Sequence, residues 1–217
     1  MRKYKTILFD LDGTLLDTIG DIRSAINKTF IKYGFTHQYS NDDVMSFIGA
    51  GAKVLINRVL KRFNVTQEVE NNFFIDYSNE YSSHKYVLTK PFDGVLNTLK
   101  TLKAKGYLLG VISNKPHLDT LDVVNMYFKD TFDIVYGKKD GIKTKPDPEV
   151  YNIIKKEYAI IDEEALYVGD MIFDVEFAKN INIDVVIMTY GYGKINKDIG
   201  QTYTFKKFED LLNILEA

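Results

Sequence analysis

Two aspartates one residue apart stand near the start of the chain. Asp10 and Asp12 lie in the segment LFDLDGT, residues 8–14, directly after an apolar run. In an extended strand, residues i and i+2 point to the same side, so the two carboxylates would project together and repel each other. Because Asp-Gly is a strong turn signal, a simple turn is the alternative interpretation. The pair nevertheless indicates a site that needs a positive counter-charge.

Hydrogen-bond donors end a second apolar run. The segment VISNK, residues 111–115, places Ser113 and Asn114 at a predicted strand end with a helix behind it. Backbone N–H groups at a helix N-terminus favour an anion there. A plain helix cap formed by Ser and Asn would give the same pattern.

A lysine occupies the entry to another predicted helix. Lys145 lies in KTKPDPEV, residues 143–150, held in a stiff frame by Pro146 and Pro148. A positive charge is poorly placed beside the positive end of a helix dipole. The position therefore suggests that Lys145 reaches for a negative group.

A further strand ends in acidic residues. In YVGDMIFD, residues 167–174, an apolar run closes with Gly169 and Asp170, and Asp174 follows one helical turn later. Helix capping is the alternative role for both acids.

Together, these acids predict a metal site. Asp10, Asp12, Asp170 and Asp174 would form an unstable anionic cluster unless a hard divalent cation sat among them, and Mg²⁺ prefers oxygen ligands of this kind. An EF-hand calcium loop fits poorly, because Thr14 stands where that loop needs an acidic or amide residue.

The elements that must position these residues alternate along the chain. From residue 91 onward, helical patterns follow Pro91, Pro116 and Pro148, and each alternates with a short apolar run. The predicted strands, including the one that opens the chain, are 6–12, 107–113, 132–137, 165–170 and 184–190. Strands and helices in alternation predict an α/β fold, a Rossmann-like parallel sheet with covering helices.

An insertion interrupts this alternation after the first strand. Roughly 75 residues lie between that strand and Pro91, where a crossover normally needs a few tens. Four helices are predicted in it: one from the spacing of Ile19, Ile22, Ile26 and Phe30, one that Asn41 would cap, and two at 52–63 and 66–86. We therefore predict an all-α cap domain at 16–88, inserted into a core made of 1–15 and 89–217.

The four motifs, in this order and on these strand ends, resemble the haloacid dehalogenase-like superfamily of aspartate-nucleophile phosphohydrolases. The resemblance spans almost the whole chain. It implies that Asp10 is the nucleophile and Asp12 the acid and then the base, and that both, with Asp170, belong to a Mg²⁺ site. Gly169 and Asp174 would support that site, and phosphate would be bound by Thr14, Ser113, Asn114 and Lys145.

The place of the insertion resembles the group with a small helical cap. Residues 47–60, FIGAGAKVLINRVL, look like a cap segment of phosphoglycolate phosphatases, which points to a small phosphorylated metabolite such as 2-phosphoglycolate. Possible substrate contacts are Gly49, Gly51, Lys53 and Arg58. A helix-to-helix turn would explain the glycines equally well, and the two basic residues would suit a solvated helix face.

Composition excludes several other classes. The 217 residues contain no cysteine, which removes disulfides and thiolate sites, and the formal net charge of -2 gives no sign of a nucleic-acid or membrane partner. No run of eighteen apolar residues occurs, so we expect a soluble cytoplasmic protein. The oligomeric state stays open. The remaining alternatives are a phosphoglucomutase-type phosphotransferase, a pyrophosphatase, a nucleotidase, and a non-catalytic protein that binds metal or a partner.

Overall fold

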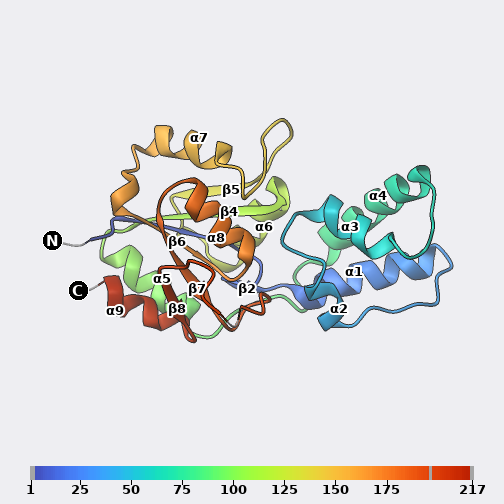
Figure 1. The fold of residues 1–217 in the computed structure, drawn as a ribbon. Coiled ribbons are helices and arrows are strands. Elements are labelled where there is room, and N and C mark those ends of the chain that lie inside the picture. Colours follow the sequence, from blue (N-terminus) through green and yellow to red (C-terminus); the bar gives the residue numbers. More distant parts are fainter. Residues whose placement is uncertain (1–2, 196, 216–217) are drawn as a thin grey trace. The chain divides into compact units, whose positions relative to one another are not determined.

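The computed structural model describes residues 3–195 and 197–215. The chain divides into two compact units, one formed by Met1–Asp17 with Pro91–Ala217 and the other by Thr18–Lys90 (Figure 1). A two-stranded sheet of β2 (Leu16–Asp17) and β3 (Lys90–Pro91) contains the boundary residues. None of the described helices is long and apolar enough to cross a membrane.

The first unit is built on a parallel sheet of six strands in the order β5-β4-β1-β6-β7-β8. Its central strand β1 pairs with β4 through Phe9 and Val111, and with β6 through Phe9 and Val168. The strands are β1 (Thr6–Phe9), β4 (Leu108–Pro116), β5 (Ile134–Lys138), β6 (Ala165–Gly169), β7 (Asp184–Met188) and β8 (Tyr203–Phe205). The predicted α/β class with a Rossmann-like parallel sheet is confirmed.

Side-chain alternation divides the core of this unit between the two faces of the sheet. Ile7 and Phe9 of β1 pack into one apolar cluster, and Leu8 packs into the other. The first cluster includes side chains of α5 (Val95–Ala104), α6 (His117–Tyr127) and α9 (Leu211–Leu215), and the second includes side chains of α7 (Glu149–Tyr158) and α8 (Ile172–Asn180). Helices on both faces leave the carboxyl ends of the strands as the place for a ligand.

The second unit is helical around an aromatic centre. Its helices are α1 (Ile19–Lys32), α2 (Asn41–Met45), α3 (Ala52–Leu60) and α4 (Gln67–His84). The Phe30 ring has its centroid 5.3 Å from that of Phe73 and 5.1 Å from that of Phe63. Phe73, Tyr77 and Tyr81 are buried at i, i+4 spacing along α4, as expected for a helix that packs on a core.

Three local predictions need correction. The first strand ends at Phe9 rather than at residue 12, because the chain turns back on itself and Asp12 bridges to Leu16. Asn41 does not cap α2: Ser40 is the cap, and its hydroxyl accepts from the Asp43 N–H in a capping box. Strand β8 was not predicted, since three residues, none of them buried, carry too little apolar pattern.

Candidate active site

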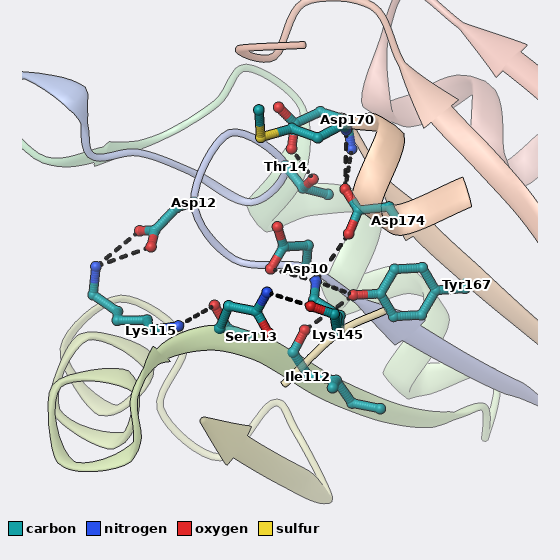
Figure 2. A network of polar contacts seen from close by, with 12 residues as sticks. Asp10, Asp12, Thr14, Ile112, Ser113, Lys115, Lys145, Tyr167, Asp170 and Asp174 are labelled. Atoms are coloured by element: carbon teal, nitrogen blue, oxygen red, sulfur yellow. Dashed lines mark hydrogen bonds and ion pairs between the residues drawn. The ribbon is translucent and has the colours of Figure 1, made fainter. Parts of the chain in front are cut away.

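The ends of the central strands bring the predicted motif residues together. Asp10 follows β1, Asp170 follows β6, and Ser113 belongs to the last part of β4, next to the point where the β4–β5 register shifts. Lys145 lies in the segment between β5 and α7. Figure 2 shows these side chains converging at one edge of the sheet.

The buried Lys145 ammonium lies at the centre of the site. It donates to Asp174 Oδ1 at 2.8 Å and to the Tyr167 hydroxyl at 2.6 Å, and it lies 3.0 Å from Asp10 Oδ1 (Figure 2). Burial lowers the pKa of Lys145, but the carboxylates of Asp10 and Asp174 outweigh it, so the pKa is raised well above its usual value. Lys145 is therefore a fixed positive charge.

Asp10 lacks a hydrogen bond to one of its carboxylate oxygens. Its Oδ1 atom is buried and makes no hydrogen bond, although the Lys145 ammonium lies nearby. Burial raises the pKa of the Asp10 carboxyl to about 6, Lys145 opposes this rise, and the carboxylates of Asp174 and Asp12 add to it. A buried carboxylate oxygen without a donor costs free energy unless something else binds it.

Asp170 is held from two sides. Its Oδ1 accepts from the Thr14 hydroxyl at 2.9 Å, and its Oδ2 accepts from the backbone N–H of Tyr192 at 2.7 Å and of Gly193 at 3.3 Å. Burial raises the pKa of Asp170 well above its usual value, and Asp174 and Asp10 add to this effect. Thr14 is fully buried and contacts this carboxylate, which places it among the supports of the site.

Glycines allow the backbone to lie close to the carboxylates of Asp170 and Asp174. A Cβ atom on Gly13 would lie 2.5 Å from Asp170 Oδ2, and φ at Gly13 is +92°, which disfavours any other residue. A Cβ on Gly169 would lie 2.3 Å from the Asp174 side chain. The Gly-Asp pair of the fourth motif is therefore required by packing as well as by sequence pattern.

Asp174 holds the loop before α8. Its Oδ2 accepts from the backbone N–H of Asp170 at 3.0 Å and of Met171 at 2.9 Å, while Oδ1 accepts from Lys145. One carboxylate therefore caps the helix and fixes the lysine. Asp174 therefore performs both of the roles that the sequence offered as alternatives, the helix cap and a part of the site.

Asp12 faces a different lysine. Both oxygens of its carboxylate lie 3.0 Å from the ammonium of Lys115, which is buried, whereas Asp12 is partly exposed (Figure 2). Ser113 Oγ accepts from the Lys115 backbone N–H at 3.3 Å. Asn114 donates from its side chain to the Lys145 carbonyl at 3.0 Å, which ties the β4 end to the Lys145 segment.

The donor set fits a hard divalent cation. Oxygens from Asp10, Asp170 and Asp174 all lie within 4.8 Å of one another. Four carboxylates, counting Asp12, surround two ammonium groups, which leaves two negative charges uncompensated. A Mg²⁺ ion would compensate them and could bind the Asp10 oxygen that has no hydrogen bond. The Asp12 carboxylate is not part of this group of three, since it is turned to Lys115.

The predicted substrate contacts lie in the second unit. Gly49 and Gly51 have φ of +100° and +90°, so backbone conformation alone requires glycine there. Lys53 is exposed, and Arg58 donates to the Phe47 carbonyl at 2.8 Å. These contacts within the unit support the turn interpretation of the glycines and a structural role for Arg58.

Sequence reasoning missed two side chains that touch the site. Lys115 belongs to the quoted segment VISNK, but its contact with Asp12 depends on the irregular end of β4. Tyr167 looks like an ordinary apolar strand residue, and only its neighbours in space reveal a polar role. The segment TYGYG, residues 189–193, also contributes, because the backbone N–H groups of Tyr192 and Gly193 donate to Asp170.

Comparison with known proteins places this arrangement in a family. The model of the haloacid dehalogenase-like hydrolases matches residues 7–188, which contain all four motifs. The chain belongs to this hydrolase family, and within it the chain is a phosphatase.

Its relatives share the whole architecture. The phosphoglycolate phosphatase of Aquifex aeolicus is 33% identical over 98% of this chain and 97% of its own, and that of Pasteurella multocida is 31% identical over the full length of both. A crystal structure from Haemophilus somnus, described as a predicted phosphoglycolate phosphatase, matches with a TM-score of 0.91 at 29% identity over 99% of each chain. The predicted resemblance to this group is confirmed.

Proposed function

We propose that this protein is a Mg²⁺-dependent phosphomonoesterase that acts through a phosphorylated Asp10, with 2-phosphoglycolate as the favoured substrate. The observation that carries the proposal is the Asp10 carboxylate, whose buried Oδ1 has no hydrogen bond and lies 3.0 Å from the fixed charge of Lys145. A carboxylate can take a phosphoryl group as an acyl phosphate when its charge and that of the phosphate are both neutralised.

The first displacement forms the covalent intermediate. A carboxylate oxygen of Asp10 attacks phosphorus while the bond to the leaving-group oxygen breaks, and Asp12 donates its proton to that oxygen. Lys145 holds the phosphoryl oxygens, together with donors from Ser113 and Asn114. When bound by Asp10, Asp170 and their neighbours, Mg²⁺ would neutralise negative charge on the phosphoryl group.

The second displacement regenerates the enzyme. Asp12 accepts a proton from water, the water oxygen attacks phosphorus, and the bond to Asp10 breaks to release inorganic phosphate. The Lys115 ammonium, 3.0 Å from both Asp12 oxygens, fixes the position of this carboxyl group.

The choice of substrate is supported by the relatives. The two relatives cited above carry the name phosphoglycolate phosphatase and are about as long as this chain. We propose that the helical second unit is a cap domain that selects a small leaving group. A phosphotransferase with the same first step remains the alternative, since only the acceptor in the second step differs.

The decisive experiment measures phosphate release by wild type and by Asp10→Asn. The panel contains 2-phosphoglycolate, sugar phosphates, a nucleotide and pyrophosphate, each with Mg²⁺ and with EDTA. We expect turnover that requires Mg²⁺, is greatest on 2-phosphoglycolate, and falls at least about 10³-fold in Asp10→Asn.

Asp93→Asn is a matched control, because Asp93 is an exposed aspartate of the same unit. This variant should behave as wild type. Retention of turnover by Asp10→Asn would refute the role of Asp10 as the nucleophile. An even profile across the panel would refute 2-phosphoglycolate as the favoured substrate and leave the mechanism standing.

A further inference from the structure

Tyr167 is a buried tyrosine at the centre of the sheet whose hydroxyl has two polar partners. The residue lies on β6 with no exposed surface, and its ring meets Phe177 edge-on at a centroid distance of 5.2 Å. The hydroxyl donates to the Ile112 carbonyl at 3.0 Å and accepts from the Lys145 ammonium at 2.6 Å (Figure 2). Burial raises the pKa of Tyr167 well above its usual value, so the hydroxyl keeps the proton that it donates.

The partner of this hydroxyl on β4 lies just beyond the last pair between β1 and β4, and it is the last residue before the β4–β5 register shifts. The last β1–β4 pair joins Phe9 and Val111, so Ile112 lies one residue past it, directly before Ser113. Tyr167 therefore connects the strand that leads into Ser113 with the lysine from a separate segment of the chain. This one hydroxyl, on the strand of the fourth motif, therefore contacts residues of two other predicted motifs.

A count of donors shows what the contact does to Lys145. An ammonium has three N–H groups and no acceptor. Hydrogen bonds to Asp174 and Tyr167 use two of them, and the Asp10 Oδ1 atom lies 3.0 Å away without a hydrogen bond. Two anchors fix the rotation of the ammonium and leave its third N–H for a ligand near Asp10.

A neutral anchor suits this position better than a charged one. A third carboxylate on Lys145 would add negative charge where a phosphoryl group must bind, and an apolar residue would leave the ammonium free to shift toward the two carboxylates. A tyrosine hydroxyl accepts from the lysine without adding charge.

We infer that Tyr167 is a positioning residue of the phosphoryl-binding site, whose hydroxyl orients the Lys145 ammonium so that one N–H meets the phosphoryl oxygens. The inference rests on the proposed function for the identity of the ligand. It is distinct from a purely structural role, in which the hydroxyl only satisfies the Ile112 carbonyl inside the core.

The test compares Tyr167→Phe with Tyr151→Phe. Tyr151 is a matched control, because it is buried in the same apolar cluster and its hydroxyl donates to Asp162 at 2.7 Å, outside the group of residues described above. Binding of inorganic phosphate in the presence of Mg²⁺ is measured by calorimetry, which needs no turnover, and kcat and KM are measured on the best substrate. Thermal unfolding reports the stability of both variants.

We expect Tyr167→Phe to weaken phosphate binding and to lower kcat/KM by about tenfold or more, as for loss of a hydrogen bond to a charged group. Tyr151→Phe should stay within about twofold of wild type in both. In a Lys145→Met background, Tyr167→Phe should have no further effect on phosphate binding, since its effect is exerted through the lysine.

Wild-type phosphate affinity and kcat/KM in Tyr167→Phe, whatever its thermal stability, would overturn the inference. If Tyr167→Phe does not fold, Tyr167→Met repeats the test, since it also lacks the hydroxyl. Activity retained by Asp10→Asn would instead refute the proposed function, while the phosphate-binding comparison would still decide the role of Tyr167.

Discussion

Buried aspartates of the two units meet their surroundings in opposite ways. Asp21, in the helical unit, accepts from the backbone N–H groups of Leu88 and Thr89 and from the Thr89 hydroxyl, all between 2.8 and 3.0 Å. Asp10, in the sheet unit, keeps one buried oxygen without a hydrogen bond. A carboxylate whose oxygens all accept hydrogen bonds stabilises the fold, whereas a carboxylate with an oxygen that lacks a hydrogen bond is available to bind a ligand.

The same contrast extends to the neighbours of each residue. Asp21 ties the beginning of α1 to the chain after α4, within a unit whose centre is aromatic. Asp10 lies among three other carboxylates and two lysines, an arrangement that costs desolvation free energy without improving packing. The comparison predicts that variants of the first kind change stability and variants of the second kind change binding.

The largest effect is expected for Lys145→Met. Turnover should fall at least about 10³-fold, because the phosphoryl group loses its fixed positive charge. In metal-free protein the free energy of unfolding should also drop by about 3–5 kcal/mol, since Asp10 and Asp174 are left without their buried cation. Phosphate release and urea denaturation measure the two effects.

Lys143→Met is the control for Lys145→Met. Lys143 lies two residues away, is largely exposed, and pairs with Asp147 at 3.3 Å. Its loss should leave turnover unchanged and alter stability by less than about 0.5 kcal/mol. Turnover above a tenth of wild type in Lys145→Met would contradict its place in the site.

Asp21→Asn should lower the stability of the protein without changing ligand binding. The amide turns an NH₂ group toward backbone donors, so the free energy of unfolding should fall by about 2–4 kcal/mol. Phosphate and Mg²⁺ binding by the folded protein should not change, because Asp21 belongs to the other unit. Urea denaturation and calorimetry at a temperature where the variant is folded measure both quantities.

Weaker phosphate binding by folded Asp21→Asn would refute the contrast drawn between the two aspartates. Loss of stability with unchanged binding would support it.

The sequence predicts the sheet and the four strand ends because both follow from local pattern. Apolar runs of six or seven residues predict the buried strands, and polar residues at or directly after their ends mark the edge where ligands bind. The pattern of the sequence therefore predicts that Asp10, Lys145 and Asp170 lie together.

Other parts of the site depend on geometry that no local pattern carries. The strand period predicts Asp10 and Asp12 on one side, but β1 ends at Phe9 and the two carboxylates face different lysines. The Lys115 contact requires the register shift at the end of β4, and the role of Tyr167 requires the spacing of β6 from β4. Both are properties of the assembled sheet.

The smallest effect is expected for Asp76→Asn in the helical unit. The carboxylate accepts from Lys32 at 2.6 Å and from the Tyr33 hydroxyl at 2.9 Å, and these hydrogen bonds lower the pKa of Asp76 below its ordinary value of 3.8. A group with a lowered folded pKa contributes stability that is fully present above the unfolded pKa and is lost as the pH falls through the folded pKa. Because Lys32 is largely exposed, we expect about 0.5 kcal/mol at most.

The pH dependence distinguishes this contribution from a packing effect. The difference in free energy of unfolding between wild type and Asp76→Asn should be constant from pH 7 to pH 5 and should shrink below about pH 4, where the unfolded carboxyl binds a proton. Urea denaturation at pH 7, 5 and 3.5 measures it, and Lys32→Met provides the double-mutant cycle. A difference that persists unchanged at pH 3.5 would mean that Asp76 stabilises the unit through packing, because a contribution from its charge must disappear on protonation.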